Sequence, residues 1–248
     1  MRRLLTGAMT VSALAFTACG LFDAPRSPAT PQPPNTNVLR DGGFEEENGA
    51  WGAKQQPEWA GFAVDGDVVH SGQRALALHL RSDAQSAPTR IAGAYQTTMP
   101  SAFPEYVSGV YRVEEWAPGT PPQYIQVVAI VHGGDFGDGI EPHEIRFVLA
   151  GIDREPFTLS NAKFLFLSRD PPPLHQWTWF GYPLGQAFLS RWGKLPTRWD
   201  SIELFFEVRY DRRPPSAPPA AADVYFDDLY AGPLAGNPNW PPGFLQDP

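Results

Sequence analysis

Cysteine is almost absent from this chain, because Cys19 is the only one among 248 residues. One thiol cannot form an intrachain disulfide, so an apolar core must hold the fold together. Basic residues are also scarce, with 19 Lys and Arg against 27 Asp and Glu and a formal net charge of −8. Binding to a phosphate backbone relies on clustered Lys and Arg, so we expect no nucleic-acid partner.

Several catalytic motifs are missing as well. The sequence contains no Gly-x-Ser-x-Gly elbow and no phosphate-cradling loop, and its one cysteine stands beside no obvious base. Ser, His and Asp are present but scattered along the chain. We therefore expect a binding function more than a catalytic one.

Long apolar runs are limited to one short stretch at the N-terminus. Two arginines are followed by the apolar residues 4–18, which are too few to span a bilayer and suit a signal peptide. The small residues before Cys19 resemble the lipobox of bacterial lipoproteins, although Phe16 stands where Leu is usual. The resemblance implies that residues 1–18 are removed and that Cys19 is lipidated. An ordinary secretory signal is the alternative.

The chain after Cys19 is predicted to form a linker, one domain and a tail. Residues 19–37 are rich in Pro, Ser, Thr and Asn and read as an extended spacer. Residues 38–232 form the predicted domain, and residues 233–248 an irregular tail. Gly20, rather than Asp, follows the cysteine, so a resemblance to enterobacterial sorting favours anchoring in the outer membrane. We expect a monomer.

Aromatic residues make up 13% of the chain, alongside 28 Pro and 23 Gly, a combination that favours strands joined by turns. Apolar alternation is clearest in 202–210, where the even-numbered residues should face the core. One short helix is expected at 183–193. The pattern predicts an all-β, two-sheet sandwich of about eleven strands, with its first and last strands side by side. Further strands are expected at 60–65, 75–80, 91–98, 106–113, 124–131, 144–150, 162–167, 176–182 and 223–231.

The last predicted strand carries two adjacent carboxylates, Asp227 and Asp228. A bare carboxylate in a strand that buries one face costs several kcal/mol, so at least one of the two needs a partner. Hydrogen bonds from loop amides could satisfy them. A cation shared with Asp41-Gly42-Gly43-Phe44-Glu45 at the other end of the domain is the second possibility.

Three stretches resemble the jelly-roll carbohydrate-binding modules of bacterial cellulases and xylanases, which belong to the galactose-binding-like sandwiches. They are 37–45 (NVLRDGGFE), 71–76 (SGQRAL) and 224–229 (VYFDDL). The resemblance implies that these stretches meet at one sheet edge around a structural calcium. Its ligands would be the carbonyls of Gly43 and Arg74 and the carboxylates of Asp227 and Glu45, a set of oxygen donors that suits Ca²⁺.

A sugar site needs flat aromatic faces and hydrogen-bonding side chains. Glu203, Glu207 and Arg209 share the outer face of 202–210, and Phe205 between them would be out of place on a solvated surface. An edge covered by the Pro-rich loop 212–222 is the other interpretation. The candidate ligand-binding residues are Trp51, Trp59, Tyr124, Gln126, Glu203, Glu207 and Arg209. Trp116, Trp177 and Trp179 could also contact a ligand, although tryptophans in a sandwich are usually core.

Two other readings stay open. Glu203 and Glu207 could be a glycosidase pair, but their Cα atoms should lie roughly 13 Å apart on one strand, and nothing selects them. The loop between His132 and Glu144 crowds His, Asp and Glu together, yet fits no zinc or calcium motif, and a solvated rim loop is expected there. The sequence thus predicts a lipid-anchored protein that binds polysaccharide without cleaving it. A jelly-roll polysaccharide lyase or hydrolase and a structural envelope protein are the alternatives.

Overall fold

The computed structural model describes residues 36–47, 49–82, 86–119, 122–152 and 158–236, all within a unit that spans Pro34–Pro248. The predicted signal peptide, Cys19, most of the linker and residues 237–248 of the tail lie outside these described residues. Within the described part, no helix is long and apolar enough to cross a bilayer.

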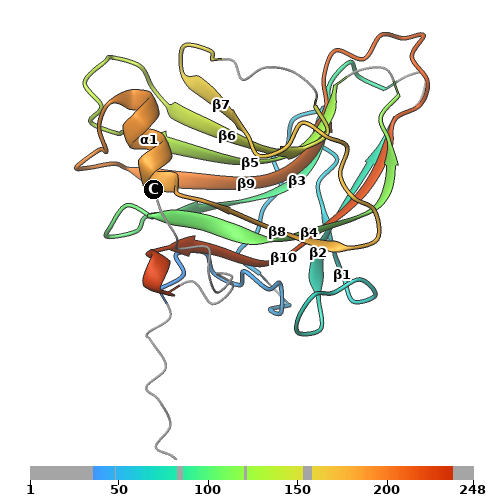
Figure 1. Cartoon of the computed structure of the whole chain (residues 1–248), viewed down its shortest axis with the longest axis horizontal. Coiled ribbons are helices and arrows are strands. Elements are labelled where there is room, and N and C mark those ends of the chain that lie inside the picture. The colour runs from blue at the N-terminus through green and yellow to red at the C-terminus, as the bar shows by residue number, and fades with distance from the viewer. Residues whose placement is uncertain (1–35, 48, 83–85, 120–121, 153–157, 237–248) are drawn as a thin grey trace, which may run out of the picture. The chain divides into compact units, whose positions relative to one another are not determined.

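Ten strands form two five-stranded sheets, shown as two layers in Figure 1 with one helix beside them. The first sheet has the order β1-β2-β10-β4-β8, and the second has the order β3-β9-β5-β6-β7. All strand pairs are antiparallel except β6 with β7. The predicted all-β, two-sheet jelly-roll sandwich with one short helix is confirmed. The elements are β1 (Ala63–Asp65), β2 (Ala75–Arg81), β3 (Arg90–Thr98), β4 (Tyr106–Ala117), β5 (Gln123–His132), β6 (His143–Ala150), β7 (Ala162–Phe166), β8 (Trp177–Tyr182), α1 (Leu184–Trp192), β9 (Ser201–Tyr210), β10 (Ala221–Gly232) and the 3-10 turn η1 (Leu234–Gly236).

The core lies between the sheets, where the alternation of β9 is clearest. Its five even-numbered residues are fully buried, as predicted, and they are Ile202, Leu204, Phe206, Val208 and Tyr210. Phe206 contacts Phe180 of β8 and Phe226 of β10 at ring-centroid distances of 6.4 and 5.7 Å, which joins the two layers. β9 is flanked by β3 and β5. The alternative of a sheet edge covered by the Pro-rich loop is therefore wrong.

The helix α1 covers one end of the sandwich. It ends at Gly193, whose φ of 80° is the left-handed conformation that terminates helices at little cost for glycine. Leu184 and Phe188 are fully buried, so this face of the helix packs on the core as its spacing predicts.

The two ends of the domain meet along β10. The amide of Val38 donates to the carbonyl of Ala231 at 2.8 Å, and the amide of Leu229 donates to the carbonyl of Gly42 at 2.8 Å. The Asn37 side chain holds the same strand, donating to Leu229 O at 2.8 Å and accepting from Ala231 N at 2.9 Å. One detail of the sequence prediction is wrong, because β2 separates the first strand, β1, from β10. The segment 37–42, which is not a strand, instead bonds residues 229–231 of β10, beyond the part of β10 that pairs with β2.

Asp227 has no exposed surface and is held by main-chain amides. One carboxylate oxygen accepts from His70 N at 2.9 Å and Ser71 N at 3.1 Å, and the other accepts from Asp228 N at 2.7 Å. Asp228 occupies a β-bulge with a φ of 52°, which points its own carboxylate to Ser71 Oγ at 2.5 Å. The loop 70–74 is thereby fastened to β10.

Gly42 tests this closure, because a Cβ at that position would lie 2.0 Å from the carbonyl oxygen of Leu229. We expect Gly42→Ala to push the N-terminal segment off β10 and to lower the free energy of unfolding by about 1–3 kcal/mol. Chemical denaturation of the two proteins measures the difference. Gly43→Ala is the matched control, since its Cβ would meet its nearest atoms at 3.9 Å, an ordinary contact, and both variants are measured in EDTA because Gly43 belongs to the expected calcium site. Equal effects of the two substitutions would contradict this account of the closure.

Candidate functional site

Six of the seven candidate ligand-binding residues lie on or beside the outer face of the second sheet. The register pairs Glu207 and Arg209 of β9 with Gln126 and Tyr124 of β5, respectively. Glu203 stands on the same face of β9, and Trp59 reaches it from a bridge to Ile91 of β3. Trp59, Glu207 and Arg209 line a groove of about 340 Å³, whereas Tyr124, Gln126 and Glu203 lie beside it on the same sheet. The groove is lined by Lys54, Gln56, Glu58, Trp59, Ile91, Val128, Ile130, Arg146, Phe205, Glu207 and Arg209.

One wall of the groove is the segment 52–61, which is fastened to the edge of β3. Gly52 and Tyr95 exchange two main-chain hydrogen bonds of 2.9 and 2.8 Å, and Ala60 N donates to Ile91 O at 2.7 Å. These bonds fix Lys54 and Trp59 above the sheet. Main-chain hydrogen bonds thus hold this loop segment as firmly as a strand, and a rigid backbone keeps the side chains of a candidate site in place.

The floor is aromatic. Phe205, only 5% exposed, stacks on Tyr95 with 5.2 Å between ring centroids and 21° between planes. Trp59 lies 6.0 Å from Phe205 and is half-buried, so part of its surface remains accessible at the rim. A flat, partly exposed indole beside an apolar floor is the kind of surface on which a sugar ring can stack.

Gly93 of β3 makes room for this arrangement. A Cβ there would lie 2.9 Å from Glu207 Cβ and 3.0 Å from the Trp59 ring, so only glycine lets the indole lie this close to β9. Sequence reasoning missed Gly93, together with Lys54 and Tyr95. The signal was available in part, because a glycine inside a predicted strand marks a close approach of another group.

Beside the groove, the Glu203 carboxylate contacts three polar side chains. Lys54 Nζ donates to its carboxylate at 3.1 Å, Thr97 Oγ1 donates at 3.2 Å, and His132 Nε2 lies 3.6 Å away. The Lys54 amine also sits 4.0 Å from the centre of the Tyr95 ring, a favourable cation–π position. The Glu203 side chain is 15% exposed and is linked to the groove through Lys54, which lines it.

A second hydrogen-bonded network is nearly buried. Gln126 Nε2 donates to Glu207, Arg209 donates to Glu207 at 3.3 Å and to Asp211 at 2.6 Å, and the Tyr124 hydroxyl donates to Asp211 at 2.6 Å. Burial raises the pKa of Tyr124 well above its ordinary value. Burial alone would favour neutral Arg209, but the carboxylate of Glu207, together with Tyr124 and Asp211, raises the pKa of Arg209 above its usual range.

Trp51 is the predicted residue that the structure does not bring to the groove. Its ring lies 5.0 Å from Phe44 and 5.7 Å from Phe206, and its Nε1 donates to Asp41 O at 2.8 Å. Trp51 therefore anchors the segment before the groove wall to the core. Trp177 and Trp179 lie on the other sheet, paired with Arg112 and Val110 of β4.

The four residues of the expected calcium site come together where the chain ends close. A Cβ placed on Gly43 would lie 3.9 Å from both Asp227 Oδ1 and Glu45 Cγ, so the two carboxylate side chains flank this glycine. Glu45 Oε1 accepts from Gln73 N at 2.8 Å and from Arg74 N at 3.1 Å. The described residues contain no group of three His, Cys, Asp or Glu side chains that could hold a metal. A cation here would thus depend on backbone carbonyls as well as on two carboxylates.

The loop between His132 and Glu144 is largely exposed, as the sequence predicts, with Gly133, residues 137–139 and Glu141 at the surface. Its end is different, because His143 is fully buried, stacks on Phe136 with 3.8 Å between ring centroids, and contacts Trp192 of α1 at 4.5 Å. The Nε2 atom of His143 lies 3.0 Å from Asp138. These contacts fasten the loop to α1.

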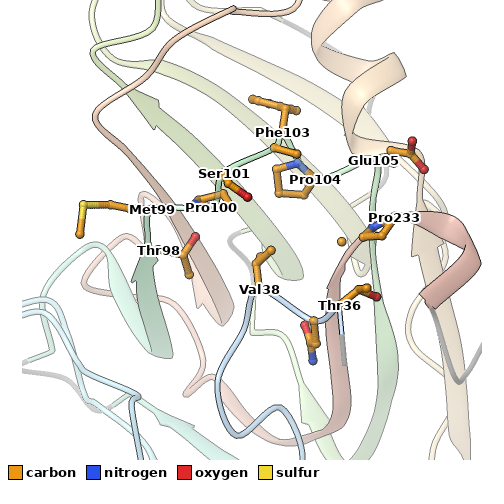
Figure 2. Close-up of a pocket in the computed structure, with 13 residues that line it drawn as sticks. Thr36, Val38, Thr98, Met99, Pro100, Ser101, Phe103, Pro104, Glu105 and Pro233 are labelled. Atoms are coloured by element: carbon orange, nitrogen blue, oxygen red, sulfur yellow. The ribbon is translucent and has the colours of Figure 1, made fainter. Parts of the chain in front are cut away.

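A larger cavity of about 490 Å³ lies where the chain ends meet, between the 98–105 connection and residues 36–38 (Figure 2). Its polar side chains are engaged in fastening the chain: Thr36 bonds Tyr230 at 3.1 Å, and Glu105 accepts from Leu234 N at 3.0 Å. Met99 is 82% exposed at its border. Among the described residues that line the cavity, Thr36 and Glu105 thus serve to hold the chain ends together.

No family model matches this chain, and no curated protein matches it either. Solved structures with a similar arrangement include the carbohydrate-binding module TmCBM61 in complex with β-1,4-galactotriose, at 13% identity and a TM-score of 0.41, covering 79% of this chain and 97% of that one. An endo-β-1,4-glucuronan lyase from the fungus Trichoderma reesei has 10% identity and a TM-score of 0.41, covering 82% and 95%. A loop-swap mutant of the Xyn11A of Necallimastix patriciarum has 10% identity and a TM-score of 0.36, covering 75% and 97%. The fold assignment therefore rests on the strand order itself.

Proposed function

We propose that this chain binds a polysaccharide in the groove on the outer face of β9 and β5 without cleaving it. The observation that carries the proposal is the half-buried Trp59 indole beside Phe205, with Lys54, Gln56 and Glu58 on the same wall of the groove. The indole and the aromatic floor suit the apolar face of a pyranose, and the polar side chains of the wall suit sugar hydroxyls.

Cleavage is the second candidate, because the groove contains carboxylates and a Tyr–Arg neighbourhood. Tyr124 is only 4% exposed and its hydroxyl donates to Asp211. Glu207 is 3% exposed and accepts from Gln126 and Arg209. A catalytic base must reach the proton that it removes, and these groups are held by one another below the surface. The geometry therefore favours binding.

Replacing Trp59 tests the binding role. We expect Trp59→Ala to weaken retention by a bound glycan roughly ten- to hundredfold, as for a central aromatic contact, with little change in melting temperature because the ring lies at the rim. Affinity electrophoresis in gels that contain soluble polysaccharides measures the loss, with the full chain carrying Cys19→Ser so that lipid does not contribute.

Trp177→Ala on the opposite sheet is the matched control and should bind as the parent does. Retention on no glycan at all, or equal weakening by the two substitutions, would reject this groove as the site. Incubation with each retained polysaccharide should leave its chain length unchanged, and shortening would favour the enzymatic alternative.

We also propose that a calcium ion binds between Asp227, Glu45 and the carbonyls of Gly43 and Arg74. The support is the pair of carboxylates on either side of Gly43 and the complete burial of Asp227. Burial raises the pKa of Asp227, although three amides donate to the carboxylate, so further positive compensation would stabilise it. The ion would tie the loop 70–74 and the segment 41–45 to β10.

Removal of calcium should lower the melting temperature by several degrees, since an ion that binds only the folded state stabilises it by mass action. The measurement is thermal unfolding with EDTA, followed by titration of excess Ca²⁺ or Mg²⁺. Ca²⁺ should restore stability, whereas Mg²⁺ should restore little because it prefers a smaller octahedral site with several waters. An unchanged melting temperature in EDTA, with no heat of binding for added Ca²⁺, would remove the ion from the proposal.

Finally, we propose that the chain is anchored through lipid on Cys19 in the bacterial outer membrane. The support is the short apolar run before the sole cysteine and the Pro-rich spacer after it. Cells fed a fatty-acid analogue should label the parent chain in the outer-membrane fraction and leave Cys19→Ser unlabelled. Labelling of both proteins, or of neither, would contradict lipidation at this residue.

A further inference from the structure

Each cationic side chain that lines the groove is already paired with a carboxylate. Lys54 contacts Glu203 at 3.1 Å, and Arg146 donates to Glu144. Arg209 contacts two acidic residues, as described above. Such pairing matters for recognition, because a guanidinium or ammonium that is already bound to a carboxylate offers little to a second anion.

Arg209 and Asp211 favour each other's ionised form. Burial favours the protonated acid at Asp211, but the neighbouring Arg209 outweighs it and holds the pKa of Asp211 below its ordinary value. The pKa of Arg209 is raised by its acidic neighbours despite its burial. The positive charge of Arg209 is therefore neutralised by acidic residues of the protein itself and is not free to bind an anionic ligand.

Carboxylates outnumber cations once the groove and the ion pairs of its cations are counted together. Glu58 lines the wall and forms no ion pair with any residue that the structure describes. The other charged lining residues are Lys54, Arg146, Arg209 and Glu207, and the three cations also pair with Glu203, Glu144 and Asp211, which lie beside the lining. These three cations and five carboxylates carry a formal charge of −2.

We propose that the groove selects polysaccharides built from neutral sugars and rejects those built from uronic acids. This inference rests on the proposed binding function and specifies its ligand class. A uronate carboxylate in the groove would meet a net negative field, or would have to displace one acidic residue from its cation and leave that residue unpaired. Either route costs free energy that a neutral sugar avoids, which is how an interface rejects a closely related partner.

The test compares oligosaccharides that differ only at C6. These are β-1,4-linked glucose and β-1,4-linked glucuronic acid oligomers of equal length, and a second pair of galactose and galacturonic acid oligomers. Titration calorimetry on the full chain carrying Cys19→Ser gives their affinities at low and high NaCl concentration. At low salt we expect at least one neutral oligomer to bind at least about tenfold more tightly than its acidic counterpart. Added salt should leave the neutral affinity almost unchanged and narrow the gap, because it screens the repulsion.

A variant with fewer negative charges in and beside the groove tests whether those charges cause the rejection of acidic sugars. The double substitution Glu58→Gln and Glu203→Gln removes two negative charges and leaves Lys54 unpaired, so it should raise the affinity for the acidic oligomer about three- to tenfold. Glu115→Gln is the control, since Glu115 pairs with Arg81 at 3.0 Å on the first sheet and should change nothing.

The outcomes separate this inference from the function on which it rests. Tighter binding of an acidic oligomer, weakening steeply with salt, would overturn the selection for neutral sugars and keep the groove as a glycan site. Binding of neither class by a folded chain would overturn both. An acidic affinity that rises equally in the Glu115→Gln control would show that the overall charge of the protein, and not the groove, decides the preference.

Discussion

A carboxylate with no contact to solvent, that of Asp227, is the constraint on which the rest of the domain depends. Burial of an unpaired charge is expensive, and three main-chain amides from two separate parts of the chain surround this one. These bonds fasten the loop at 70–74 to β10, while Asn37 and Gly42 fasten the N-terminal segment to the same strand. The loop and the N-terminal segment are thus both held by β10, the central strand of the first sheet.

The groove on the second sheet is a consequence of the same closure. Gly42 makes the last main-chain hydrogen bond of the N-terminal segment with β10. Further along, Trp51 packs against Phe44 and Phe206 and donates a hydrogen bond to the carbonyl of Asp41, which holds the segment on the core. The next ten residues then run along β3 as the groove wall. The segment 37–61 thus connects the first sheet to the outer face of the second sheet, where the groove lies. Trp51, which the sequence suggests as a ligand contact, instead holds this segment in place.

Much of the fold could be predicted because its signals are local. The alternation in 202–210 and the glycine after α1 each follow from neighbouring residues, and both are confirmed. The outer face of β9 was also predictable, since Phe205 between two glutamates is inconsistent with a solvated surface. What could not be predicted was the long-range register that sets Gly93 against Glu207 and Tyr95 against Phe205. Such register depends on packing between distant strands, which no single stretch encodes. Similarly, the burial of His143 could not be predicted, because its partners Phe136 and Trp192 lie in other parts of the chain.

The meeting of residues 37–42 with 229–231 has a topological consequence. Since the two ends of the sandwich lie against each other, a short peptide could join them, and the chain could be opened at an exposed turn instead. The same proximity would let the whole sandwich be inserted into a surface loop of another protein without stretching that loop. The groove, built on β9 and β5 of the other sheet, would keep its shape wherever the domain were spliced.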